Sequence, residues 1–174
     1  MNKMKLQMRI NAPLPLCRLI TAILFLCTVS LSAQTAAELD ILLNTREVST
    51  AGAARVILEA AKLLPEGLYG EEAQNAAYKT ALSMKWLTKE PDEALTMKDA
   101  AFLVMKAFDM KGGLMYSLFH SPRYAYREMV YRKLIQGRSD PAMHVSGPGL
   151  LQIMGGTLNF IGEDIQFAQQ GEPQ

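Results

Sequence analysis

The sequence predicts an all-α domain of about six helices that follows a signal peptide. From Ala36 onward the apolar residues recur at helical spacing, and no stretch alternates between apolar and polar over the roughly four to eight residues of a half-buried strand. The 174 residues are 49% hydrophobic, which is enough for one sizeable core. This composition argues against disorder, a collagen-like chain and a disulfide scaffold.

Residues 1–33 have the order of a secretory signal peptide. Residues 1–18 are basic and contain no acid, and Leu19 to Leu31 form an uncharged apolar run of 13 residues. Such a run is shorter than the roughly 20 residues that span a bilayer as a helix. We expect cleavage after Ala33, with cleavage after Ser32 and a retained membrane anchor as alternatives. The protein is then exported to the periplasm, the cell envelope or the cell surface.

The export signal also holds both cysteines, Cys17 and Cys27, so the mature chain is expected to form no disulfide. Lipidation of Cys27 is a weaker alternative, because the bulky Leu26 precedes it. After residue 33 there are 14 basic and 17 acidic side chains, a net charge of −3. This balance argues against a general nucleic-acid binder, which usually carries a basic excess.

The apolar spacing and the capping residues set the limits of each predicted helix. Thr96 followed by Asp99 has the form of a capping box, and Ser121-Pro122 combines a capping side chain with proline at the first helical position. Between Lys111 and Phe119 we expect a turn and a short apolar segment that packs on the rest. The predicted helices are about Ala36–Leu43, Ser49–Leu63, Glu71–Trp86, Thr96–Met110, Pro122–Leu134 and Ser146–Leu158, followed by a flexible tail over 166–174.

Part of the chain repeats. Ala77-Tyr78-Lys79 recurs as Ala125-Tyr126-Arg127, and the same shift of 48 residues aligns the apolar positions that follow. Within residues 34–165 we therefore expect two whole helix-loop-helix units, at about 71–110 and 121–158, and a half unit at about 48–63.

These repeats resemble the S-layer homology module, in which a polar loop with Asp and Pro leads to a second helix opened by Thr or Ser and carrying an Ala-Ala pair. The resemblance covers Ser49 to Leu158 and implies modules that associate in threes. It also implies an envelope protein that binds an anionic cell-wall polysaccharide through a Thr-Arg-Ala-Glu-like motif.

The sequence departs from the family at that motif. The matching tetrads are Ser49-Thr50-Ala51-Gly52, Thr96-Met97-Lys98-Asp99 and Ser146-Gly147-Pro148-Gly149, and none has Arg in second place. An Arg would supply a planar fork for carboxylate or phosphate. Thr96, Lys98 and Asp99 are therefore weak motif equivalents, and a solvated lysine is the simpler interpretation of Lys98.

Basic residues gather in one short stretch, which is the best candidate for an anionic-ligand site. On a helix Arg123 and Arg127 are neighbours at i and i+4, and tyrosine rings such as that of Tyr124 can pack against a sugar or a guanidinium. The alternative is a solvated helix face in which Glu128 partly neutralises the arginines. The candidate residues are Arg123, Arg127, Arg132, Lys133, Arg138 and Tyr124.

Motifs for catalysis and metal binding are missing from the sequence. His120 and His144 each lack a nearby ligand partner, and no Gly-x-Ser-x-Gly or Ser-x-x-Lys motif occurs. We therefore expect a non-enzymatic binding protein with no cofactor and no metal. Its expected partner is a cell-wall glycan such as peptidoglycan with its polymers, or another envelope component. A periplasmic scaffold for a protein partner is the alternative, a homo-oligomer is possible, and an unrecognised enzyme ranks third.

Overall fold

A computed structural model describes residues 37–137 and 140–170, with side chains only as far as 162 in the last helix. These residues form seven helices and no strand, which confirms the all-α prediction. Leu42–Gln174 is one compact unit. Residues 37–44 are helical, and the later helices are α2 (Thr50–Ala60), α3 (Gly70–Ser83), α4 (Met97–Ala107), α5 (Leu114–Phe119), α6 (Pro122–Tyr131) and α7 (Gly147–Gln170).

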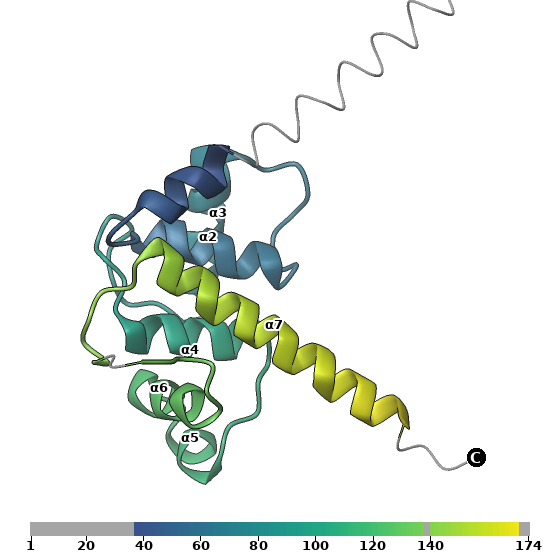
Figure 1. Cartoon of the computed structure of the whole chain (residues 1–174). Helices are drawn as coiled ribbons and strands as arrows, with labels where there is room; N and C mark the ends of the chain where they lie inside the picture. The colour runs from purple at the N-terminus through teal and green to yellow at the C-terminus, as the bar shows by residue number, and fades with distance from the viewer. Residues whose placement is uncertain (1–36, 138–139, 171–174) are drawn as a thin grey trace, which may run out of the picture. The chain divides into compact units, whose positions relative to one another are not determined.

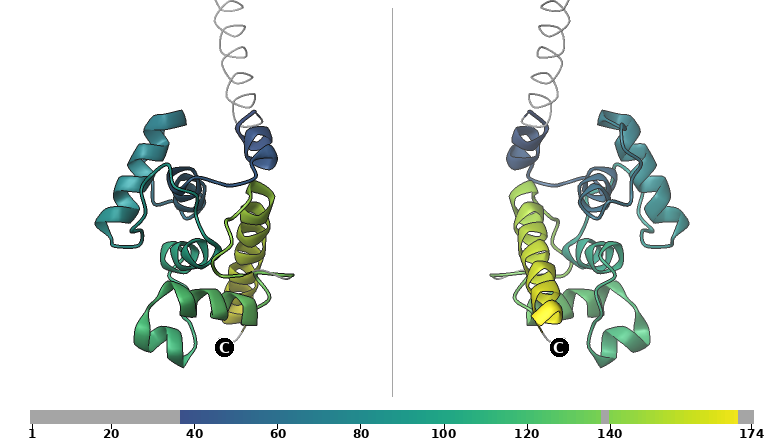
Figure 2. Two further views of the ribbon diagram at one scale, coloured as in Figure 1. Left: turned by 90° about the vertical axis from the view of Figure 1, so that its left-hand side faces the viewer. Right: turned by 90° about the vertical axis from the view of Figure 1, so that its right-hand side faces the viewer.

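The helices pack in pairs. α2 packs against α3, and α4 packs against α6, while α2 and α4 also touch each other (Figure 1). Figure 2 shows α2 and α4 between α3 and α7. Each packed pair therefore joins the second helix of one predicted unit to the first helix of the next.

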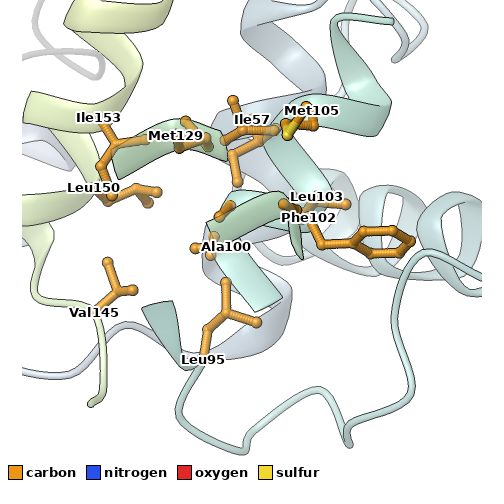
Figure 3. Packing of buried hydrophobic residues seen from close by; sticks show 14 of the residues in the cluster. Ile57, Leu95, Ala100, Phe102, Leu103, Met105, Met129, Val145, Leu150 and Ile153 are labelled. Atoms are coloured by element: carbon orange, nitrogen blue, oxygen red, sulfur yellow. The ribbon is translucent and has the colours of Figure 1, made fainter. Parts of the chain in front are cut away.

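The core lies where these helices face one another. α2 contributes an Ala-Ala pair with Ile57 and Leu58, and α4 contributes a second Ala-Ala pair with Leu103, all of them fully buried. Figure 3 shows Ile57, Leu103, Met129 and Ile153 converging from four helices. The small alanines let the helix backbones approach closely, and the aliphatic side chains fill the remaining space.

A closed ring of three backbone hydrogen bonds joins the segments before α2, α4 and α7. The amide N–H of Val48 donates to the carbonyl oxygen of Val145 at 2.8 Å, that of Leu95 to Val48 at 3.0 Å, and that of Val145 to Leu95 at 2.9 Å. All three side chains are buried. The three predicted helix starts thus meet around one centre within a single chain.

A second set of bonds surrounds this ring. The residue two positions beyond each ring member donates its N–H to a carbonyl oxygen of the neighbouring loop. These bonds run from Thr50 to Glu93 at 2.8 Å, from Met97 to Met143 at 2.8 Å and from Gly147 to Thr45 at 2.9 Å.

Four helices end earlier than predicted, and for one reason. After α2, Lys62 adopts a left-handed conformation with φ 56°, and Leu63 N–H bonds back to the carbonyl of Leu58 at 2.9 Å. This Schellman motif reverses the chain. After the later helices the residue beyond the turn, Trp86, Met110 or Leu134, still packs on the core, so the apolar pattern outlasts the helix. The predicted ends Leu63, Trp86, Met110 and Leu134 are the residues that follow left-handed Lys62, Lys85, Asp109 and Lys133.

Two further predictions need correction. The α5 segment packs on the rest of the fold through Tyr116, which is buried, and Phe119, which stacks on Tyr124 of α6, whereas Leu114, Met115 and Leu118 are exposed on α5. The last helix does not stop at Leu158, because α7 continues to Gln170 and includes the start of the predicted tail.

Several predictions fall outside the described residues: the signal peptide at 1–33, Arg138, and residues 171–174 of the tail. In the part of the chain that the structure describes, no helix is both long and apolar enough to cross a membrane.

Candidate functional site

The tetrad that opens α4 places its side chains differently from the prediction. Thr96 is the N-cap of α4, but its hydroxyl does not accept a backbone N–H. Instead its Oγ1 donates to Oδ2 of Asp99 at 2.5 Å. At the equivalent starts, Ser49 and Ser146 do accept backbone N–H bonds, each at 3.2 Å. The capping box therefore has the predicted residues and position but a different hydrogen bond.

Asp99 belongs to a polar cluster centred on Lys89. Lys89 Nζ lies 2.8 Å from Glu93 Oε1 and 4.0 Å from Asp99 Oδ2, and it donates to the carbonyl of Ala94 at 3.0 Å. The hydrogen bond from Lys89 holds the pKa of Glu93 below its ordinary value. Lys89 is thus held by the loop that leads into α4.

This cluster borders a cavity of about 240 Å³. The loop after α3, the first turns of α4 and the start of α6 form its walls. Phe102 points away from the other labelled core side chains (Figure 3) and lines this space. The lining residues are Lys85, Trp86, Leu87, Thr88, Lys89, Asp99, Phe102, His120, Ser121 and Pro122. We call this space the α3–α6 groove.

The groove combines aromatic, cationic and acidic groups. Lys85 is exposed in its left-handed position, and Trp86 is half-buried beside it. An indole ring offers a flat apolar face to a sugar, and a lysine offers a point charge to an anionic substituent. Of the predicted motif residues, Asp99 lines this groove. The backbone N–H of Lys98 is bonded to Pro141 at 3.0 Å.

Lys85, Trp86 and Phe102 are not among the site residues predicted from the sequence. Lysine recurs before the last apolar residue of three predicted helices, at Lys62, Lys85 and Lys133. This recurrence in the sequence indicates where a helix ends and where an exposed lysine follows it.

The second residue of each motif-like tetrad is unable to face a ligand in this chain. Thr50 and Gly147 are buried, and Met97 is only 9% exposed. At Gly147 the backbone of Leu42 occupies the place of a side chain. The absence of Arg from these positions therefore agrees with their surroundings.

The predicted basic patch divides into an internal and an external part. Arg132 is internal: its Nε bonds to Glu128 Oε1 at 2.8 Å, its guanidinium lies 5.0 Å from the ring centre of Phe160, and its Nη2 donates to the carbonyl of Lys111. Arg132 thus connects α6 to the loop before α5 and to α7. It is a structural residue and not a free ligand contact.

The external part lies along α6. Arg123 and Arg127 are exposed, and Tyr131 follows one turn later with 83% of its surface exposed. Lys133 is exposed beyond the end of the helix. Tyr124 instead stacks on Phe119 with ring centres 5.3 Å apart. The structure therefore keeps Arg123 and Arg127 exposed on one helix, while the ring of Tyr124 packs on Phe119.

A second cavity, of about 310 Å³, lies between the end of α4 and α5. Tyr116 lines it, and burial, together with the nearby charge of Asp109, raises the pKa of Tyr116 to about 12. The His120 ring centre is 5.4 Å from that of Tyr116. The phenol of Tyr116 therefore stays protonated at ordinary pH and packs in this cavity as a neutral group.

Within the described residues, no three His, Cys, Asp or Glu side chains come together as metal ligands. His144 contacts Glu47, with Nδ1 3.1 Å from Oε1. Comparison with known protein families, with curated proteins and with solved structures finds no match.

Proposed function

We propose that this protein is an exported, non-catalytic component of a bacterial cell envelope and that its α3–α6 groove binds an anionic cell-wall glycan. The proposal keeps the divergent S-layer homology resemblance as its starting point. One observation carries it: Asp99, the last residue of the motif-like tetrad, lines a groove that also presents Trp86 and Lys85.

The groove suits a charged sugar chain better than a small apolar ligand. Its walls mix an indole and a phenyl ring with lysine, carboxylate and hydroxyl groups. Rings stack on sugar faces, while the polar groups exchange hydrogen bonds with hydroxyls. Pro122 also lines the groove, and the exposed Arg123 follows it directly, so an additional cation stands near one end.

Lys85 and Lys62 provide a matched test of this site. Both lysines are exposed, both follow a helix with left-handed φ values of 58° and 56°, and only Lys85 lines the groove. The full chain and its Lys85→Glu and Lys62→Glu variants would be sedimented with peptidoglycan, with and without its attached polymers. We expect binding that depends on the polymers, weakens with salt and is reduced only by Lys85→Glu.

Other outcomes would redirect the proposal. Equal binding by both variants would remove the groove as the site, and a double variant Arg123→Ala with Arg127→Ala would then test the external face of α6. No binding to either wall preparation would contradict the glycan proposal. Cross-linking in intact cells would then seek a protein partner.

A further inference from the structure

The short helix α5 carries an apolar surface that the rest of the described chain leaves uncovered. Leu114 is 82% exposed, Met115 55%, Leu118 68% and Phe119 56%. These residues form two neighbouring i, i+4 rows on one side of the helix. Exposed side chains of this size are normal when scattered, but a contiguous group marks an interaction surface.

The surface is held in place by contacts on the opposite side of α5. Tyr116 is buried, Ser117 Oγ donates to the carbonyl of Gly112 at 3.2 Å, and Glu128 of α6 accepts the N–H of Gly113 at 3.0 Å. The bond from Arg132 to the Lys111 carbonyl fixes the same loop. The fold thus holds α5 in place with Leu114, Met115 and Leu118 exposed and with Phe119 partly covered by Tyr124.

Basic residues surround this helix. From Met110 to Lys133 the sequence has five basic residues and one acid, whereas the rest of the chain after residue 33 has nine basic and sixteen acidic residues. Glu128 is paired with Arg132. Asp109, one residue before this stretch, lies near Tyr116 and adds one negative charge beside α5. The exposed part of the protein nearest α5 therefore carries a local positive charge in an otherwise acidic chain.

The position of Arg127 places charge beside the apolar surface. α6 lies against α5, and Tyr124 and Glu128 mark the side of α6 that faces it. A helix turns by about 100° per residue, so Arg127 and Tyr131 lie on the shoulder next to that side. Lys111 is exposed just before α5.

We propose that α5 is a docking surface for an anionic phospholipid membrane. Its apolar side chains enter the boundary between headgroups and acyl chains, while Lys111 and Arg127 contact the phosphates. A symmetric contact between the α5 surfaces of two copies would bring like charges together, so charge disfavours that arrangement. The inference is independent of glycan binding in the α3–α6 groove.

A tryptophan reporter tests where the protein meets lipid. Leu118→Trp places an indole on α5, and Leu82→Trp places one on an exposed position of α3, with Trp86 common to both. The full-length variants would be mixed with two kinds of vesicle. One is made of phosphatidylcholine alone, and the other of equal amounts of phosphatidylcholine and bromine-labelled phosphatidylglycerol. We expect quenching of the Leu118→Trp signal by the anionic vesicles and little quenching of Leu82→Trp.

Two sets of variants test the apolar and the electrostatic contributions to lipid binding separately. Leu114→Ser with Leu118→Ser should weaken binding to anionic vesicles by at least about tenfold, because two side chains lose their burial in lipid. Arg127→Gln and Lys111→Gln should each weaken it by about fivefold and leave binding to neutral vesicles unchanged. Leu82→Ser with Met84→Ser, exposed on α3 and at its end, is the control and should have no effect.

The proposal fails if both tryptophan reporters are quenched equally, or if neither is quenched. Loss of self-association in the Leu114→Ser, Leu118→Ser variant, without lipid quenching in the reporter, would overturn it and make a second copy the occupant. Because these side chains are exposed, circular dichroism should show an unchanged helix content. Wall binding retained by this variant and lost in Lys85→Glu would separate the two sites.

Discussion

The carbonyl oxygen of Leu42 lies in the space that a side chain at Gly147 would need. Gly147 is buried at the start of α7, and its N–H is bonded to the carbonyl of Thr45 at 2.9 Å. Since backbone cannot move aside as a side chain can, Gly147→Ala should destabilise the fold by about 2–3 kcal/mol. Thermal and urea unfolding would measure this loss.

Gly155 is the matched control for that substitution. It lies in α7, it is exposed, and a Cβ there would meet nothing within 4 Å. Gly155→Ala should therefore stabilise the protein by about 0.5–1 kcal/mol, because alanine favours a helix over glycine. An unchanged midpoint for Gly147→Ala would contradict the close approach of Leu42.

The left-handed backbone of the lysines that follow the helices predicts that glycine at these positions would stabilise the fold. Lys62 has φ 56°, a conformation that costs a side-chain-bearing residue about 1 kcal/mol relative to glycine. Lys62→Gly should raise the free energy of unfolding by about that amount. Lys79→Gly, at an exposed position inside α3, should lower it by about 1 kcal/mol. If both substitutions destabilise alike, the Schellman ending of α2 is wrong.

The sequence predicts helix starts more accurately than helix ends. Ser49, Thr96 and Ser121 stand at the N-cap positions of their helices, and only Ser49 accepts a backbone N–H with its side chain, so the predicted capping bonds of Thr96 and Ser121 are absent. The ends are missed because Trp86 continues the apolar period as a residue packed beyond its helix. No glycine follows α3, so the usual residue that marks a left-handed turn is missing at Lys85, and only the recurrence of lysine at Lys62, Lys85 and Lys133 indicates it.

The candidate site is less predictable than the fold, for a physical reason. Spacing along one helix identified Arg123 and Arg127 as exposed neighbours. It gave no indication that Arg132 bonds to the Lys111 loop, or that Phe102 and Trp86 border one groove. These relationships join segments that are distant in sequence, and helical periodicity describes only which side of its own helix a residue occupies.

The internal role of Arg132 predicts a loss of stability rather than of binding. Arg132→Ala removes the ion pair with Glu128, the bond to the Lys111 carbonyl and the contact with the Phe160 ring. The free energy of unfolding should fall by about 1–3 kcal/mol. Arg127→Ala on the same helix is the comparison and should change it by no more than about 0.5 kcal/mol. Similar losses from both variants would contradict the division between internal and external arginines.

Tyr116 predicts a specific loss of stability at high pH. Burial, with the nearby charge of Asp109, raises its pKa in the folded state from the ordinary 10.0 to about 12. Between these two values the unfolded chain has released the phenol proton and the folded chain still holds it. Stability from this group is therefore fully present below pH 10 and falls by about 2 kcal/mol as the pH rises to 12. Urea unfolding of the protein and of Tyr116→Phe across this range should give curves that converge with rising pH, since phenylalanine has no proton to lose. Parallel curves would mean that Tyr116 ionises equally in the folded and unfolded states, and that its hydroxyl is not buried.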